Sequence, residues 1–353
     1  MWRHLPTPLL ALLLSVAPLR PCAAQPEQRT STMLIKGAAV LAQEEGMAHM
    51  AEGRFADAIK PLERAAHAPP LTSAGERLNA ATVHNALGGA YKNMARLDEA
   101  VASFERALSA LSPLTIGAAQ ADADDARAAR LEAAAVTNNL GSVHAEAKRD
   151  AEAAAMYDAA LEAFDAEAAR DEQPDPRNAD ALNNLADLRH GAGRMEEARV
   201  LHERALRIRE EAFGATHPHL AGSLNNLAVL HMDERRPADA LPLLKRAASI
   251  TRQSAGTAHP HYATALNNLA GALSQLDRAH EARPHLQTAL SINIKALGRQ
   301  HASTESAKQN LAACDAAVAR EAAKRHAANL EADFAHVPKP EAGPGDKELK
   351  EEL

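Results

Sequence analysis

The composition of the chain excludes several classes of protein. Its 353 residues carry a formal net charge of −7, with both signs interspersed, and aromatic residues make up 3%. Because no basic block stands out, we expect no nucleic-acid-binding surface and no affinity for an anionic membrane. Ala, Leu, Glu and Arg dominate, whereas the β-branched and aromatic residues that favour strands are scarce. The composition therefore predicts an all-α fold built from many thin, closely packed layers.

The N-terminal residues are typical of a signal peptide. Arg3 and His4 give a short positive region, Leu9–Val16 an apolar run, and Cys22-Ala23-Ala24 a cleavage site of small residues. The apolar run is far shorter than the roughly 20 residues that span a membrane. We therefore predict a signal peptide over residues 1–24, a linker over 25–33, export with the periplasm as the favoured compartment, and no stable membrane insertion.

The two cysteines bear on the compartment. A lipid anchor at Cys22 is the less favoured alternative, because only Leu19 of the preceding residues matches a lipobox. After cleavage, Cys314 would be the single remaining cysteine and could form no intramolecular disulfide. A lone cysteine between alanines on a helix is expected to be a small buried apolar residue.

The next part of the chain predicts paired helices with irregular spacing. Glycine and alanine recur at Gly46, Gly53, Ala58 and Ala65 in a first unit, which is the weakest. The second unit has Leu87, Gly88, Tyr91, Ala100, Phe104 and Ala107, and the third has Leu140, Gly141, Ala153 and Ala160. The wider spacing between the second and third units predicts an extended helix and a loop around Ser112–Arg130.

From residue 180 onward the pattern becomes strictly periodic. Asn-Asn-Leu begins at Asn183, Asn225 and Asn267, at steps of 42 residues, and a further step reaches Gln309-Asn310-Leu311. The same step relates three glycines and three histidines between the units: Gly214, Gly256 and Gly298, and His217, His259 and His301.

Each periodic unit predicts two helices. Leu182, Leu185 and Leu188 form the apolar face of the first helix, a turn follows near Gly193, and Ala198, Leu201 and Ala205 form the packed stripe of the second. Gly214 and its equivalents suit a left-handed stop after the second helix. Pro218 and Pro260 suit a first helical turn, where no hydrogen bond is lost.

These residues resemble the tetratricopeptide repeat (TPR). The second unit matches the TPR signature at Leu87, Gly88, Tyr91, Ala100, Phe104 and Ala107. The 42-residue units, with Ala181–Ala186, Arg204–Ile208 and Gly214–Pro218, are similar to the kinesin-light-chain type. The resemblance implies an α-solenoid, a right-handed superhelix of about six helix pairs. We expect the TPR array over residues 34–303, a capping helix over 304–334 and a disordered tail over 335–353.

The resemblance also implies that the first helices line a concave channel. A carboxamide both donates and accepts, so asparagines repeated along such a wall could bond an extended peptide backbone. The alternative is that one asparagine of each pair bonds a neighbouring repeat instead of a ligand. The predicted channel residues are Asn85, Asn138, Asn139, Asn183, Asn184, Asn225, Asn226, Asn267, Asn268, Asp187, His190 and Met232.

The function that follows is a non-enzymatic scaffold for a protein or peptide partner. The alternative is a structural assembly factor that self-associates through its convex face or its terminal helix. His217-Pro218-His219 and His259-Pro260-His261 could share a metal ion, but no cysteine or carboxylate cluster accompanies them. We therefore expect no metal, no cofactor and no catalytic residue.

Overall fold

The structure, a computed structural model, describes residues 26–67, 73–116, 122–171 and 174–335. The predicted signal peptide and all but the first residue of the predicted tail lie outside these ranges. Within them all regular structure is helical, with thirteen α-helices and no strand, which confirms the all-α prediction. The helices are α2 (Pro26–Ala51), α3 (Phe55–Ala66), α4 (Ala74–Asn93), α5 (Leu97–Ile116), α6 (Ala123–Glu146), α7 (Asp150–Asp171), α8 (Asn178–Gly191), α9 (Met195–Phe213), α10 (Leu220–Asp233), α11 (Pro237–Ser254), α12 (Pro260–Gln275), α13 (Ala279–Leu297) and α14 (Ala302–Ala335).

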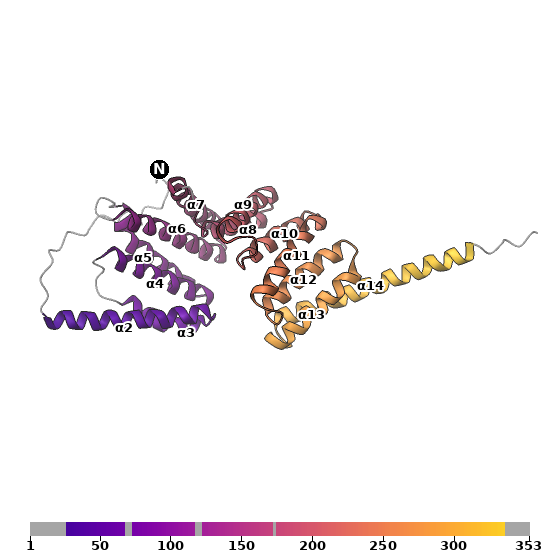
Figure 1. Ribbon diagram of the computed structural model, residues 1–353, viewed down its shortest axis with the longest axis horizontal. Coiled ribbons are helices and arrows are strands. Elements are labelled where there is room, and N and C mark those ends of the chain that lie inside the picture. Colours follow the sequence, from indigo (N-terminus) through magenta and orange to yellow (C-terminus); the bar gives the residue numbers. More distant parts are fainter. Residues whose placement is uncertain (1–25, 68–72, 117–121, 172–173, 336–353) are drawn as a thin grey trace, which may run out of the picture. The chain divides into compact units, whose positions relative to one another are not determined.

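The helices from α2 to α13 form six hairpins, and α14 follows them (Figure 1). We call the N-terminal helix of each hairpin its first helix and the other its second helix. These hairpins and the added helix confirm the predicted solenoid of about six helix pairs. Residues 26–33, which we expected to be linker, belong to α2.

The chain divides into two compact units, Met1–Ala121 and Asp122–Leu353. The first contains the hairpins α2/α3 and α4/α5; the second contains the other four hairpins and α14. In the second unit every second helix packs on the first helix of the next hairpin, or on α14. Neighbouring first helices also touch one another, whereas neighbouring second helices do not among the described residues. The first helices of this unit therefore line its inner, concave face.

Small residues bring the two helices of each hairpin together. Ala198 and Ala205 of α9 are completely buried, and so are Ala240, Ala247, Ala282 and Ala289 at the equivalent positions of the next two hairpins. Earlier in the chain a glycine faces a large side chain instead, as Gly88 does on Phe104. A small residue opposite a larger one lets the axes approach without leaving a void.

The turn within each hairpin has the same backbone in all six cases. One residue adopts a positive φ, and the six are Gly53 (71°), Ala95 (57°), Lys148 (60°), Gly193 (76°), Arg235 (58°) and Asp277 (55°). Four of them carry a side chain, which makes this left-handed conformation costly. A glycine pattern alone therefore could not have located all six turns.

The junctions between hairpins differ in one detail from the expectation. Gly214 and Gly298 follow their helices with φ of 81° and 88°, but with ψ of 167° in both cases. This is an extended conformation open almost only to glycine, and it is not the left-handed helical stop that we predicted. Pro260 does open α12, but Pro218 lies in the turn ahead of α10.

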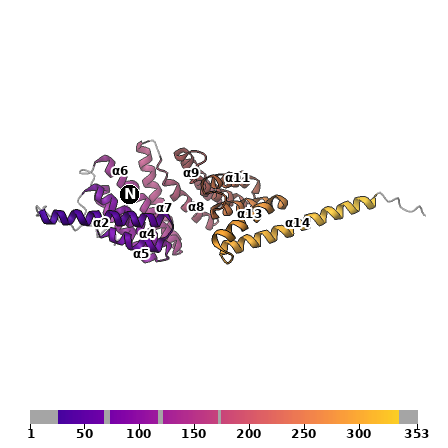
Figure 2. The ribbon, with the colours of Figure 1, turned by 60° about the horizontal axis from the view of Figure 1, so that its bottom comes forward.

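The C-terminal helix α14 packs on α13 over its first half only. Cys314 is buried there, and its Sγ donates to the carbonyl oxygen of Ala279 at 3.2 Å. Residues 322–329 are all exposed, and the end of the helix extends beyond α13 in both views (Figures 1 and 2).

Candidate functional site

All the predicted channel residues lie on first helices. Asn85 is half-buried on α4 in the first unit, and the others lie on α6, α8, α10 and α12 of the second. Asn85 and Asn139 both take part in interactions within the chain. The candidate site is therefore restricted here to the concave face of the second unit.

Two pairs of asparagines connect helices of successive repeats, the first pair between two first helices and the second between α12 and α14. The side-chain nitrogen of Asn184 on α8 donates to Oδ1 of Asn138 on α6 at 2.9 Å. In the same way, Asn310 on α14 donates to Asn267 on α12 at 2.8 Å. Such amide–amide bonds correspond to the inter-repeat role that the sequence left open as an alternative.

Asn183 belongs to a buried polar network. Its Oδ1 lies 2.8 Å from Nδ1 of His202, and its Nδ2 donates to Oγ of Ser223 at 3.3 Å. Arg209 donates both to Ser223 and to Asp180. Asn183 is only 7% exposed and His202 only 1%. The Asn183 amide thus connects α8 to α9 and α10, and it is occupied by these contacts.

His202 is a residue that the sequence analysis overlooked. One and two periods later its position is taken by Leu244 and Leu286. This difference between His202 and the leucines of the next two repeats could have indicated a polar network, because a polar side chain at a buried position needs hydrogen-bond partners. Asn183 supplies one, and Asp187 Oδ1 lies 3.4 Å from Nε2 on the other side of the ring.

Two asparagines keep their amide groups available. Asn226 on α10 and Asn268 on α12 are half-buried, and no interaction of either side chain occurs within the described residues. The adjacent Asn225 has a buried Oδ1 that no described residue bonds. Since α10 and α12 touch each other, the two available amides lie on neighbouring helices of the concave face.

Both apolar and polar side chains surround the amides of Asn226 and Asn268. Val229 is 39% exposed, and Met232 lies against Gly271 of α12. Nε2 of His190 lies 2.9 Å from Oδ2 of Asp233, so the predicted channel residue His190 is paired across the α8–α10 boundary. The combination of apolar contact with free donors and acceptors suits a segment of polypeptide.

Three features bear on other kinds of site. Within the described ranges, no group of three or more His, Cys, Asp and Glu side chains is placed to hold a metal ion. No helix in the same residues is long and apolar enough to cross a bilayer. Burial raises the pKa of the Cys314 thiol, which disfavours the reactive thiolate.

Comparisons with known proteins identify the repeat. Models of the tetratricopeptide repeat match residues 81–110, 177–253 and 219–295. A comparison with curated protein sequences gives no significant match.

Solved structures share the fold at low sequence identity. BtubC (BKLC) from P. vanneervenii is 22% identical, with a TM-score of 0.53 over 69% of this chain and 94% of that one. The Rap conjugation gene regulator of plasmid pLS20, in complex with a Phr peptide, is 14% identical, with a TM-score of 0.53 over 87% of this chain and 80% of that one. TPR-like repeats of a Podosopora anserina chain described as a kinesin light chain are 19% identical, with a TM-score of 0.46 over 61% of this chain and 95% of that one.

Successive helical hairpins, packed on their neighbours within each of the two units, define an α-solenoid of the interaction-scaffold class. Residues 81–110 and 177–295 match models of the tetratricopeptide repeat, so the chain contains TPRs. The predicted tetratricopeptide repeats are confirmed over these residues.

Proposed function

We propose that this chain is an exported, non-enzymatic scaffold that binds an extended segment of a protein partner along the first helices of its second unit. The observation that carries the proposal is the pair of available amides, Asn226 and Asn268, on touching helices of the concave face. TPR proteins bind protein or peptide partners, and the Rap regulator among the structural relatives holds a peptide.

The chemistry favours recognition of backbone over side chains. Each free carboxamide can accept from a peptide N–H and donate to a peptide C=O. Each such bond contributes on the order of 1 kcal/mol net. Together with apolar contact to Val229 and Met232, a few of them support binding in the micromolar range, about −8 kcal/mol.

Export is supported by the N-terminal sequence. The positive region, apolar run and small-residue cleavage site of residues 1–25 have the order and lengths of a secretory signal. The partner is accordingly sought in the cell envelope, with the periplasm as the favoured compartment.

The test removes the two available amides. Purified wild type and an Asn226→Ala/Asn268→Ala double variant are compared in a crosslinking pulldown from the native envelope, and captured segments are then titrated as labelled peptides. We expect the variant to lose capture and to bind the peptides at least tenfold more weakly, with unchanged helical circular dichroism.

The matched control is Gln253→Ala/Gln287→Ala. It removes two exposed carboxamides from α11 and α13, the second helices of the same two repeats. Binding by the control should equal that of wild type. Equal capture by all three proteins, or equal loss in both variants, would exclude the concave face.

A second candidate function is self-association through α14. Residues 322–329 form two helical turns exposed on every side, and an isolated helix of this length is marginal in water without a packing partner. Light scattering of the full chain and of a chain ending at Ala319 distinguishes the two: an oligomer lost on truncation would support this role.

A further inference from the structure

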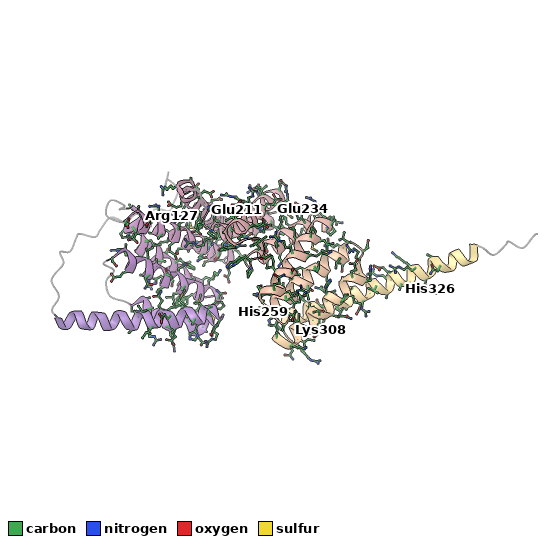
Figure 3. The ribbon with its side chains drawn as sticks, viewed as in Figure 1. Arg127, Glu211, Glu234, His259, Lys308 and His326 are labelled. Carbon is green, nitrogen blue, oxygen red and sulfur yellow. The ribbon has the colours of Figure 1, made fainter. Side chains whose placement is uncertain are left out.

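We propose that three histidines make the junctions between the last repeats sensitive to acid. His217, His259 and His301 precede α10, α12 and α14 at the same place in the repeat. In each case the ring Nδ1 accepts from the backbone N–H two residues later: His219 at 3.4 Å, His261 at 3.2 Å and Ser303 at 3.1 Å. Figure 3 shows His259 at its junction.

These hydrogen bonds fix the tautomer of each ring. A backbone N–H can only donate, so Nδ1 must accept and the neutral ring must carry its proton on Nε2. A second proton can then bind only at Nδ1. Protonation therefore removes the acceptor in the first turn of α12 and of α14, and at His217 it removes the bond to His219 directly ahead of α10.

The added charge is also poorly placed. A cation at a helix N-terminus meets the positive end of the helix dipole. The rings of His219 and His261 lie 5.0 and 4.6 Å from those of His217 and His259, so positive charges on both rings of such a pair would repel each other. Among the described residues no carboxylate forms an ion pair with any of the three rings, whereas other histidines do have such partners.

The charged groups near these loops are engaged elsewhere. Beside the His217 loop, Arg246 of α11 pairs with Glu210 of α9 and donates to the carbonyl of Ala215. Beside His301, Lys308 pairs with Glu305 and donates to the carbonyl of Arg299. Lys308 lies at the packed end of α14 in Figure 3. None of these pairs offers a free carboxylate to a protonated ring.

Acid is therefore expected to lower the stability of the folded chain. The unfolded chain can bind these protons without losing a cap, so acid favours the unfolded chain over the folded one. Each junction connects a second helix to the next first helix, so acid weakens the stacking of the last three repeats and α14 rather than the hairpins themselves.

The experiment compares melting by circular dichroism at about pH 7.5 and about pH 5.5 for four full-length proteins. The first two are wild type and His217→Asn/His259→Asn/His301→Asn. Asparagine is a good N-cap whose oxygen does not titrate in this range. The third protein carries alanine at the same positions, and the fourth carries His280→Asn/His326→Asn, which changes exposed histidines outside the caps.

We expect the asparagine variant to lose roughly 3–6 °C less than wild type on acidification. The alanine variant should melt below wild type at the higher pH and close to it at the lower pH, and the His280/His326 variant should follow wild type. Burial lowers the pKa of His84, His144 and His285, which adds an acid effect common to all four proteins. An asparagine variant that loses as much stability as wild type would overturn the proposal, and so would an alanine variant as stable as wild type at the higher pH.

Discussion

At the scale of single residues, contact between paired helices depends on the absence of a side chain. A Cβ added to Gly88 would lie 2.6 Å from Cε1 of Phe104 and 2.8 Å from two further atoms of the ring. Phe104 is almost completely buried, so the ring has little room to move. The glycine is therefore required by packing and not by backbone conformation.

We predict that Gly88→Ala destabilises the protein by about 1–3 kcal/mol through overpacking. The matched control is Gly89→Ala, where the added Cβ would meet only Met50 Cε at 3.5 Å. That change should be neutral or stabilising by up to about 1 kcal/mol, because alanine is the better helix former. Urea unfolding followed by circular dichroism measures both. A smaller loss at Gly88 than at Gly89 would refute the packing argument.

The turns within hairpins offer a stabilising substitution. Arg235 is exposed and holds φ at 58°, whereas Gly193 fills the equivalent place one repeat earlier. We predict that Arg235→Gly raises stability by up to about 1 kcal/mol, because the left-handed strain is removed. Gly193→Ala should lower it by a similar amount. A drop in the melting temperature of the Arg235 variant would contradict this reading of the turn.

At the scale of elements, each first helix has one face for packing and one for the concave surface. Leu227 of α10 is 5% exposed, whereas Val229, two residues later, is 39% exposed. The two positions test the division within a single helix.

We predict that Leu227→Asp destabilises the protein by at least about 3 kcal/mol, because it removes apolar contact and buries an unpaired carboxylate. Val229→Asp should cost less than about 0.5 kcal/mol, as surface changes usually do. Thermal melting separates the two outcomes. Unchanged melting of the Leu227 variant would show that this face does not pack as described.

Asparagines at equivalent positions of the first helices differ in their hydrogen bonding. Asn183 and Asn225 occupy equivalent positions, but His202 and Ser223 bond Asn183, while Oδ1 of Asn225 has no hydrogen-bond partner in the part of the chain that the structure describes. The neighbouring helices, and not the helix that carries the residue, decide whether an amide is occupied.

At the scale of the whole molecule, the helices of the described residues contact only near neighbours along the chain. Such a solenoid is stabilised by a sum of local interfaces, so parts of it can fold alone. The second unit begins at Asp122 and contains four hairpins and α14.

We predict that a chain of residues 122–335 folds on its own, with helical circular dichroism and a sigmoidal melting curve. A chain of residues 150–335, which lacks α6, should be less stable because α7 loses its hairpin partner. If the longer fragment were unfolded, the second unit could not be an independent part of the solenoid.

The sequence by itself determined the repeat, the helix pairs and the faces that pack. The same residue types recur at equivalent positions, as Ala198 and Leu227 do in their repeats, because the two helices pack in the same way in each of these hairpins. The periodicity also placed the candidate residues on the first helices.

Only the tertiary structure decided which of those residues are available. Asn184 and Asn310 bond asparagines on neighbouring helices, and Asn183 is enclosed by a network centred on His202. Asn226 and Asn268 have no partner among the described residues. The repeat pattern in the sequence shows which residue types successive repeats have in common. Hydrogen bonding depends instead on which side chains meet across the interface between two different repeats.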